Sequence, residues 1–339
     1  MRFLLSGKYA NNFGFSLDKP LLSPKILLER MIPIMKEYLD LKLDFMFKQL
    51  FGHPSRKQLT IAFLNAVLHR TGHDRIIDVQ FDNTELAKEF EEGKMNRLDV
   101  LVWTDRGERI NVEIQIIDQH DMPERILYYW ARLFSQSLFK GQGYSELPPT
   151  IMIAILNYPL FPHETDRFHT IFHIREDEEQ FLWSAHLEFH AIDLSQFMVK
   201  WKKYRRDVKR SSEWPWLMML SAVDARKQEI DETILKELEV LAMNEQEIRK
   251  ALEEWEKLSV SSENRYAYEM RLKWLRDQLS NLLGERRAGM EEGLKQGLKQ
   301  GREEERKNMI RHMSAKGMAA KDIADLTGLA EEEVRKWLK

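Results

Sequence analysis

Acidic and amide side chains recur at alternate positions within residues 98–116, which read LDVLVWTDRGERINVEIQI. Apolar residues on both sides of a polar turn predict the two strands of a hairpin, with Asp99 on the first strand. Because strand side chains alternate between faces, Asn111, Glu113 and Gln115 share one face of the second strand. The opposite face carries the apolar residues that would pack on a core, Ile110, Val112, Ile114 and Ile116.

The register of the hairpin decides whether Asp99 joins these polar groups. Opposed side chains stand about 4.5–5.5 Å apart at Cβ, and a slip of one residue would turn Asp99 to the other face. Two carboxylates at that distance repel each other unless a proton or a cation lies between them. Such an oxygen-rich set favours a hard ion such as Mg²⁺. The alternative is a solvated strand face that carries Asp and Glu by chance.

The segments around the hairpin predict an α/β arrangement that would position it. Helical spacing of apolar residues indicates helices over 40–51, 55–69 and 119–140. Apolar runs indicate strands over 76–81, 150–156, 169–175 and 187–193. The run 150–156 suits a strand buried on both faces. Together these elements predict a three-stranded meander after two helices, within a mixed sheet flanked by helices.

From residue 211 onward the pattern is helical, and it ends in two distinctive segments. Gly289, Gly293, Gly297 and Gly301 recur every four residues, and each glycine costs a helix about 1 kcal/mol relative to alanine. These glycines either allow helices to approach closely or mark a hinge. Residues 309–338 read as short helix, glycine turn and short helix. That pattern is typical of a DNA-binding helix-turn-helix or of a hairpin used for packing or dimerisation.

Positive charge is local in this chain. The net charge is −3 over 339 residues, so any contact with nucleic acid must come from local patches. The strongest patch is 200–210, KWKKYRRDVKR, for which a solvated face is the alternative. The residues that we expect to contact DNA phosphates are Lys200, Lys202, Lys203, Arg205, Arg206, Lys321 and Arg335.

Composition and motifs exclude several kinds of site. The chain has no cysteine, which excludes disulfides, zinc–thiolate sites and a cysteine nucleophile and is compatible with the cytoplasm, where we expect the protein. No phosphate-binding loop of the form GxxxxGK[ST] is present, so we expect no nucleotide cofactor. No apolar run reaches the ~18 residues of a membrane span. The histidines lack convincing metal-ligand spacing in the sequence, which favours structural or surface roles for them.

Three segments resemble one known family. They are LDFMFKQLFG (43–52), NRLDVLVWTDRGERINVEIQI (96–116) and RILYYWARLFSQSLFKGQGYSELPPTIMIAILNY (125–158). They are similar to the Rpn recombination-promoting nucleases, also described as PD-(D/E)XK nuclease family transposases. The resemblance implies an α/β core of the restriction-endonuclease-like PD-(D/E)XK kind with a helical C-terminal extension.

Residue patterns and the resemblance, which covers roughly residues 40–220, together divide the chain into four parts. They predict an N-terminal arm over 1–39 and a nuclease-like domain over 40–225. A helical and glycine-repeat region for linking or oligomerisation would follow over 226–308, and a helix-turn-helix-like unit over 309–339.

The same resemblance assigns roles to residues of the hairpin. Asp99 and Glu113 would hold Mg²⁺, with Mn²⁺ or Ca²⁺ as alternatives, and the Ile114 carbonyl would be a further ligand. Gln115 stands where most such nucleases carry lysine. A neutral amide can orient a water or a phosphate oxygen, but it stabilises developing negative charge less than an ammonium group does.

Three further residues enter the implied site from the flanking helices. Asp44 would hold a second ion or orient a water, and Arg125 and Tyr129 would support the site. The implied activity is metal-dependent cleavage of DNA, in recombination or in the biology of mobile DNA or defence. The alternative is a DNA-binding or assembly protein whose nuclease fold has little activity. In both cases we expect DNA as a partner and a homo-oligomer formed through the C-terminal helices.

Overall fold

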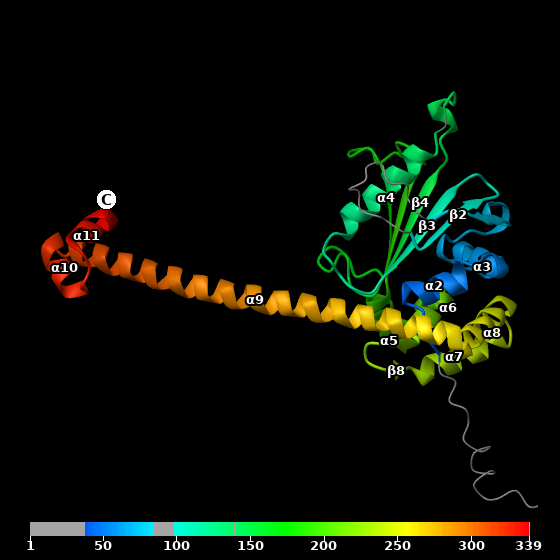
Figure 1. Ribbon diagram of the computed structural model, residues 1–339. Coiled ribbons are helices and arrows are strands. Elements are labelled where there is room, and N and C mark those ends of the chain that lie inside the picture. Colours follow the sequence, from blue (N-terminus) through cyan, green and yellow to red (C-terminus); the bar gives the residue numbers. More distant parts are fainter. Residues whose placement is uncertain (1–37, 85–97, 139, 339) are drawn as a thin grey trace, which may run out of the picture.

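The computed structural model describes residues 38–84, 98–138 and 140–338. Figure 1 shows a sheet with helices around it and one long helix that runs away from this body. The strands are β1 (Val79–Phe81), β2 (Val100–Thr104), β3 (Arg109–Gln115), β4 (Thr150–Leu156), β5 (His169–His173), β6 (Leu187–Asp193), β7 (Val223–Asp224) and β8 (Glu229–Ile230).

The helices are α2 (Asp44–Phe51), α3 (Lys57–Val67), α4 (Met122–Gln136), α5 (Leu194–Val208), α6 (Trp214–Ser221), α7 (Glu232–Ala242), α8 (Gln246–Val260), α9 (Ser262–Ala315), α10 (Ala320–Thr327) and α11 (Glu331–Leu338). Short 3-10 turns lie at Pro54–Arg56, Gly72–Asp74 and Tyr144–Glu146.

A six-stranded mixed sheet in the order β1-β2-β3-β4-β6-β5 forms the centre of the molecule. Strands β1, β2 and β3 make the predicted antiparallel meander. Strands β3, β4 and β6 run parallel, and β5 is antiparallel to β6. Every residue of β4 is buried, as its continuous apolar run predicts. The predicted α/β architecture, a mixed sheet flanked by helices, is therefore confirmed.

The two faces of the sheet belong to different hydrophobic clusters. Ile110, Val112 and Ile114 of β3 are buried in the larger cluster, which includes side chains of α2, α3, α5 and α6. On the other face, Leu101 of β2 and Met152 of β4 pack with residues of α4. The polar face of β3 is therefore covered by a helix, and the alternative of a solvated strand face is wrong.

The larger cluster continues past residue 225, where we expected the nuclease-like domain to end. Leu238 of α7, Trp255 of α8 and Leu272 of α9 all belong to it. The Tyr38 ring lies 4.3 Å from the Trp255 ring, and the Trp255 indole donates a hydrogen bond to the Leu39 carbonyl at 2.8 Å. The rest of the expected N-terminal arm, residues 1–37, lies outside the described residues.

Helix α9 carries the glycine repeat within one continuous helix of 54 residues. Its first part packs on the body, and its far end carries α10 and α11 (Figure 1). Ile310, Ile323 and Val334 form a small core between these three helices. Gly328, at φ 68°, ends α10 in the left-handed conformation that glycine adopts readily. No helix in the described ranges is long and apolar enough to cross a membrane.

We predict that Trp255→Ala lowers the free energy of unfolding by about 3–5 kcal/mol, because the side chain is fully buried and its removal leaves a cavity. Trp183→Ala is the matched control, since Trp183 is 76% exposed and should change stability by no more than about 0.5 kcal/mol. Urea unfolding followed by tryptophan fluorescence measures both. Equal effects of the two substitutions would show that α8 is not part of the core.

Candidate active site

The pairing of β2 with β3 places Asp99 opposite Glu113. Val100 pairs with Val112 in this antiparallel pair. Asp99 comes directly before Val100 and Glu113 directly after Val112, so these two residues face each other. The Asp99 backbone N–H donates to Glu113 Oε1 at 3.3 Å, and the Ile114 N–H donates to Asp99 Oδ2 at 2.9 Å. This is the register that brings both carboxylates to one face.

Both carboxylates are buried, and burial changes their titration. Asp99 is 6% exposed and Glu113 2% exposed. Burial raises the pKa of Asp99, and burial together with the charge of Asp99 raises the pKa of Glu113 to about 8. The Asn111 amide donates to Glu113 Oε1 at 3.1 Å, which offsets part of this cost. The pair therefore favours a proton or a metal cation between its oxygens.

A positive charge reaches this pair from α2. The Lys48 Nζ lies 3.0 Å from Asp99 Oδ1, and its attraction lowers the pKa of Asp99 against the effect of burial. Gln115, two residues beyond Glu113, lines the same cleft without a charge of its own. We did not predict Lys48 as a site residue. Its position four residues after Asp44, within a segment that resembles the family, was the signal available for it.

Asp44 also lines the cleft, but its carboxylate is already paired. The Arg271 Nε donates to Asp44 Oδ1 at 2.6 Å, and the Arg271 Nη2 binds the other carboxylate oxygen. Arg271 comes from the first part of α9, so the long helix forms one wall of the cleft. A role for Asp44 in holding a second ion stays a prediction, because an ion there would compete with the guanidinium.

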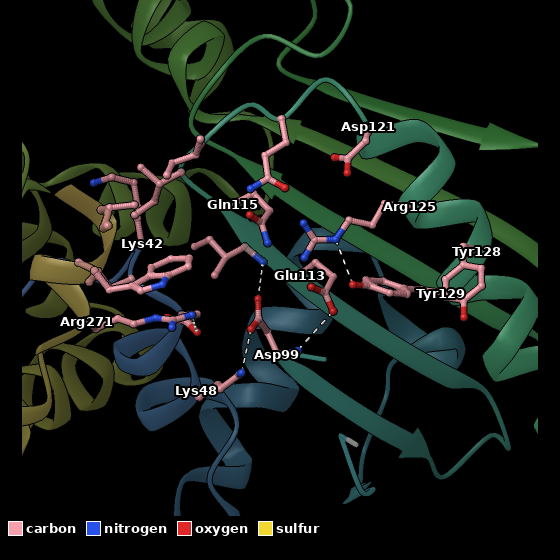
Figure 2. A pocket seen from close by; sticks show the side chains of 18 of the residues that line it. Lys42, Lys48, Asp99, Glu113, Gln115, Asp121, Arg125, Tyr128, Tyr129 and Arg271 are labelled. Carbon is pink, nitrogen blue, oxygen red and sulfur yellow. Dashed lines mark hydrogen bonds and ion pairs between the residues drawn. The ribbon is translucent and has the colours of Figure 1, made fainter. Parts of the chain in front are cut away.

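Arg125 and Tyr129 lie one turn apart on α4, on the other side of the carboxylate pair. The Arg125 Nε donates to the Tyr129 hydroxyl oxygen at 3.1 Å. Burial raises the pKa of Tyr129, so its hydroxyl keeps a proton that it can donate. Figure 2 shows Lys48 on one side, Arg125 and Tyr129 on the other, and Asp99 and Glu113 between them.

These side chains surround a cleft of about 910 Å³, which is large enough to admit a backbone phosphate with its neighbouring sugars. Both cations and carboxylates line it. The charged residues that line it are Lys42, Lys48, Arg125 and Arg271, with Asp44, Asp99, Glu113, Asp121 and Glu124. The cleft can therefore offer cationic groups to a phosphate and carboxylates to a metal ion at the same place.

The basic residues expected at DNA lie outside the lining of this cleft. Lys200 forms an ion pair with Asp166, and the Arg205 guanidinium lies 4.6 Å from the Trp201 ring. Lys202, Lys203 and Arg206 are exposed on the same helix, α5. Lys321 and Arg335 belong to the unit at the far end of α9, where Arg335 Nη2 pairs with Glu331 Oε1 at 2.6 Å. DNA binding by these residues stays a prediction.

We predict that Glu113→Gln stabilises the metal-free protein, and more so as pH rises. The folded chain holds a proton on Glu113 up to pH of about 8, whereas an unfolded glutamate loses it near about 4.3. Folded stability therefore falls between these two pH values in the wild type, and the amide removes that loss. Thermal unfolding in a chelator at pH 5.5 and 8.5 measures the difference.

Glu124→Gln is the control for this experiment, because Glu124 lines the same cleft but is exposed. Its effect on stability should be small at both pH values. A stabilisation by Glu113→Gln that does not grow with pH would contradict the assignment of a buried, repelling carboxylate pair.

The comparisons with known proteins identify a family for most of this chain. A family model described as PD-(D/E)XK nuclease family transposase matches residues 41–285, more than half of the sequence. The match includes every residue of the cleft described above. No curated protein and no solved structure gives a match. The chain belongs to the PD-(D/E)XK nuclease family transposases.

Proposed function

We propose that the protein is a Mg²⁺-dependent DNA endonuclease. The observation that carries this proposal is the buried pair Asp99 and Glu113, with Lys48 beside it. Mg²⁺ is usually held by one or two carboxylates together with substrate phosphate and water. The donor set of this cleft fits that requirement, with the Ile114 carbonyl as a further oxygen ligand. Mn²⁺ and Ca²⁺ prefer the same oxygen ligands.

The residues of the cleft would divide the work of phosphodiester hydrolysis between them. A bound divalent cation supplies Lewis acidity towards the scissile phosphate and the attacking water. Lys48 stabilises the negative charge that develops on the phosphate, which is the task that Gln115 cannot perform. The Gln115 amide would orient a water or a phosphate oxygen. The Tyr129 hydroxyl accepts a hydrogen bond from Arg125 and would donate one within the cleft.

The wider role that we propose is cleavage of DNA during recombination or the movement of mobile DNA, as in recombination-promoting nucleases. The description of the family as nuclease transposases supports it. The lysines and arginines of α5 would contact backbone phosphates outside the cleft without reading sequence.

We predict that the purified protein cleaves supercoiled plasmid DNA with Mg²⁺ or Mn²⁺, and that a chelator stops the cleavage. Asp99→Asn should abolish it. Lys48→Met should lower the rate by about 10²–10³-fold, as expected when one charged donor is lost at a developing anion. Gel electrophoresis of the nicked and linear products measures the rates.

Lys57→Met is the control for Lys48→Met, because Lys57 pairs with Asp78 at the surface and should keep the wild-type rate. Cleavage that survives Asp99→Asn would sink the assignment of this site. DNA binding without cleavage under any divalent ion would favour the alternative, a DNA-binding or assembly protein with an inactive nuclease fold.

We also propose that copies of the chain associate through α9. Met290, Leu294 and Leu298 are 74%, 65% and 57% exposed on this helix, next to the glycine repeat. A Cβ atom on any of these glycines would meet open space, so no contact within residues 38–84, 98–138 and 140–338 repays their cost to the helix. These three apolar residues and the four glycines form a stripe along α9. A second helix lying close against this stripe would bury the leucines and occupy the space beside the glycines.

The double substitution of Leu294→Glu and Leu298→Glu should shift the protein to the mass of a monomer in light scattering after size exclusion. Gln296→Glu with Gln300→Glu adds the same charge beside the stripe and should leave the assembly intact. A wild type that is already monomeric, or equal masses for the two double variants, would contradict the proposal.

A further inference from the structure

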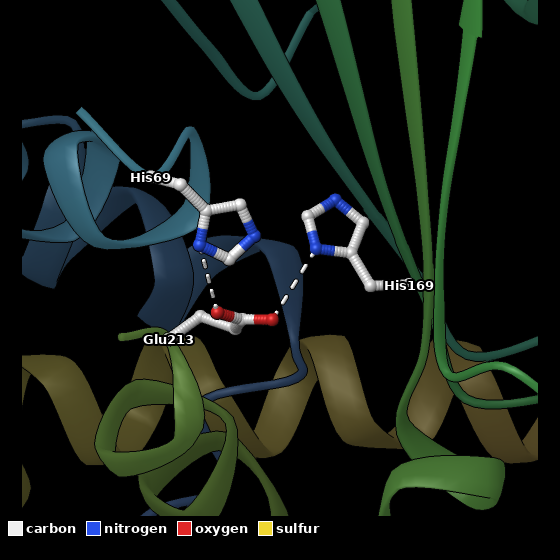
Figure 3. Close-up of side chains that lie close together, drawn as sticks. All are labelled: His69, His169 and Glu213. Carbon is white, nitrogen blue, oxygen red and sulfur yellow. Dashed lines mark hydrogen bonds and ion pairs between the residues drawn. The ribbon is translucent and has the colours of Figure 1, made fainter. Parts of the chain in front are cut away.

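A second group of ligating side chains lies outside the cleft. His69 follows α3, His169 begins β5, and Glu213 directly precedes α6. Figure 3 shows the two imidazole rings on either side of the Glu213 carboxylate. The three residues lie far apart in the sequence, which explains why the spacing of the histidines did not reveal this group.

The ligand atoms of this group lie close enough together for one metal ion to reach them after a rearrangement. His69 Nδ1 lies 3.4 Å from Glu213 Oε2, and His169 Nδ1 lies 3.3 Å from Glu213 Oε1. One ligand atom from each of the three residues lies within 4.8 Å of the other two. Ligands about 2.0–2.1 Å from a tetrahedral Zn²⁺ stand roughly 3.3 Å from one another. The three ligand atoms would therefore have to move closer together around one ion, and His69 Nδ1 would have to leave Ser212 Oγ, which lies 3.0 Å from it.

Contacts behind His169 fix the orientation of its ring. His169 Nε2 lies 2.9 Å from His190 Nδ1, and His190 Nε2 lies 2.7 Å from Glu188 Oε1. This chain of contacts leaves His169 Nδ1 facing Glu213 Oε1 at 3.3 Å. A proton or a metal cation can lie between these two atoms.

Glu213 gives a second and independent indication. Its side chain is 2% exposed, and its Oε2 is a buried oxygen with no hydrogen-bond donor in the described part of the chain. A buried carboxylate oxygen without a donor is costly. His69 approaches this oxygen from just after the end of α3, at φ 53°, the left-handed conformation in which helices commonly end.

We propose that His69, His169 and Glu213 bind one Zn²⁺ ion, at a site separate from the nuclease cleft. Imidazole nitrogens with a carboxylate suit Zn²⁺, whereas Mg²⁺ prefers oxygen ligands alone. The His190–Glu188 pair behind His169 orients the ring, as acceptors behind metal-bound histidines do. A cavity of about 540 Å³ adjoins the three ligands and leaves room for water as the fourth ligand. The ion would connect the end of α3, the edge strand β5 and the start of α6.

Zinc binding is tested on full-length, tag-free, metal-free protein in excess Mg²⁺, which keeps the carboxylate cleft occupied. We expect one Zn²⁺ per chain by elemental analysis and isothermal titration, and a rise in the melting temperature. Co²⁺ in place of Zn²⁺ should produce the intense visible absorption of a tetrahedral site. Glu213→Gln and His169→Ala should weaken Zn²⁺ binding by at least ~100-fold, and His190→Ala by about 10–100-fold.

His69→Gly keeps the test decisive if the buried variants fail to fold. The His69 side chain is 44% exposed, and glycine adopts a positive φ without strain, so this variant should be as stable as the metal-free wild type and lose Zn²⁺ binding. His120→Gly is the control, because His120 also has a positive φ, of 60°, and its side chain is 87% exposed. Wild-type protein that binds no Zn²⁺, or a His69→Gly variant that binds it equally well, would overturn the proposal.

Discussion

Two carboxylates, Asp99 and Glu113, are buried side by side on neighbouring strands, and the polar groups of the cleft are arranged around them. Asp99 and Glu113 lose the solvation that would favour their charged forms, and each charge also disfavours the other. The surroundings offset part of this cost with the Asn111 amide, the Ile114 N–H and the Lys48 ammonium group. What remains favours a cation at this pair, which is the basis of the metal site that we propose.

The helices bring the other charged and polar groups to this pair. Helix α4 covers the polar face of β3 and brings Arg125 and Tyr129 beside Glu113, while α2 brings Lys48 to Asp99 from the other side. The start of α9 closes the cleft through Arg271, which pairs with Asp44. The helix that carries the terminal unit is therefore also part of the wall of the cleft, so assembly and cleavage would share one element.

Much of the fold is readable in the sequence, because alternation and helical spacing are local properties. The buried strand β4, the meander and the apolar face of β3 are of this kind. The continuation of the core into α7 and α8 cannot be inferred from the sequence, because the pattern of an amphipathic helix does not show which element the helix packs against. The register that brings Asp99 to Glu113 was likewise open in the sequence and is decided by pairing within the sheet.

The residues that the sequence did not reveal share one physical reason. Lys48 forms an ion pair with Asp99 from a different element of the fold. Likewise, His69, His169 and Glu213 come from three separate elements that meet only in the folded chain. Spacing along the chain reports on neighbours within one element and is silent about such encounters. Gln115 illustrates the consequence, since the sequence shows no lysine at that position, and the fold alone shows that Lys48 of α2 lies 3.0 Å from Asp99.

In the proposed mechanism, the cleft needs one ammonium group beside the carboxylate pair, whichever element supplies it. Moving that group from α2 to β3 tests this requirement. Mg²⁺-dependent cleavage by Lys48→Met is compared with cleavage by Lys48→Met combined with Gln115→Lys. We expect the double variant to recover at least ~10-fold of the rate lost in the single variant, since both positions line the same cleft. A double variant that is folded and binds the metal ion, but is no faster than Lys48→Met, would overturn this requirement.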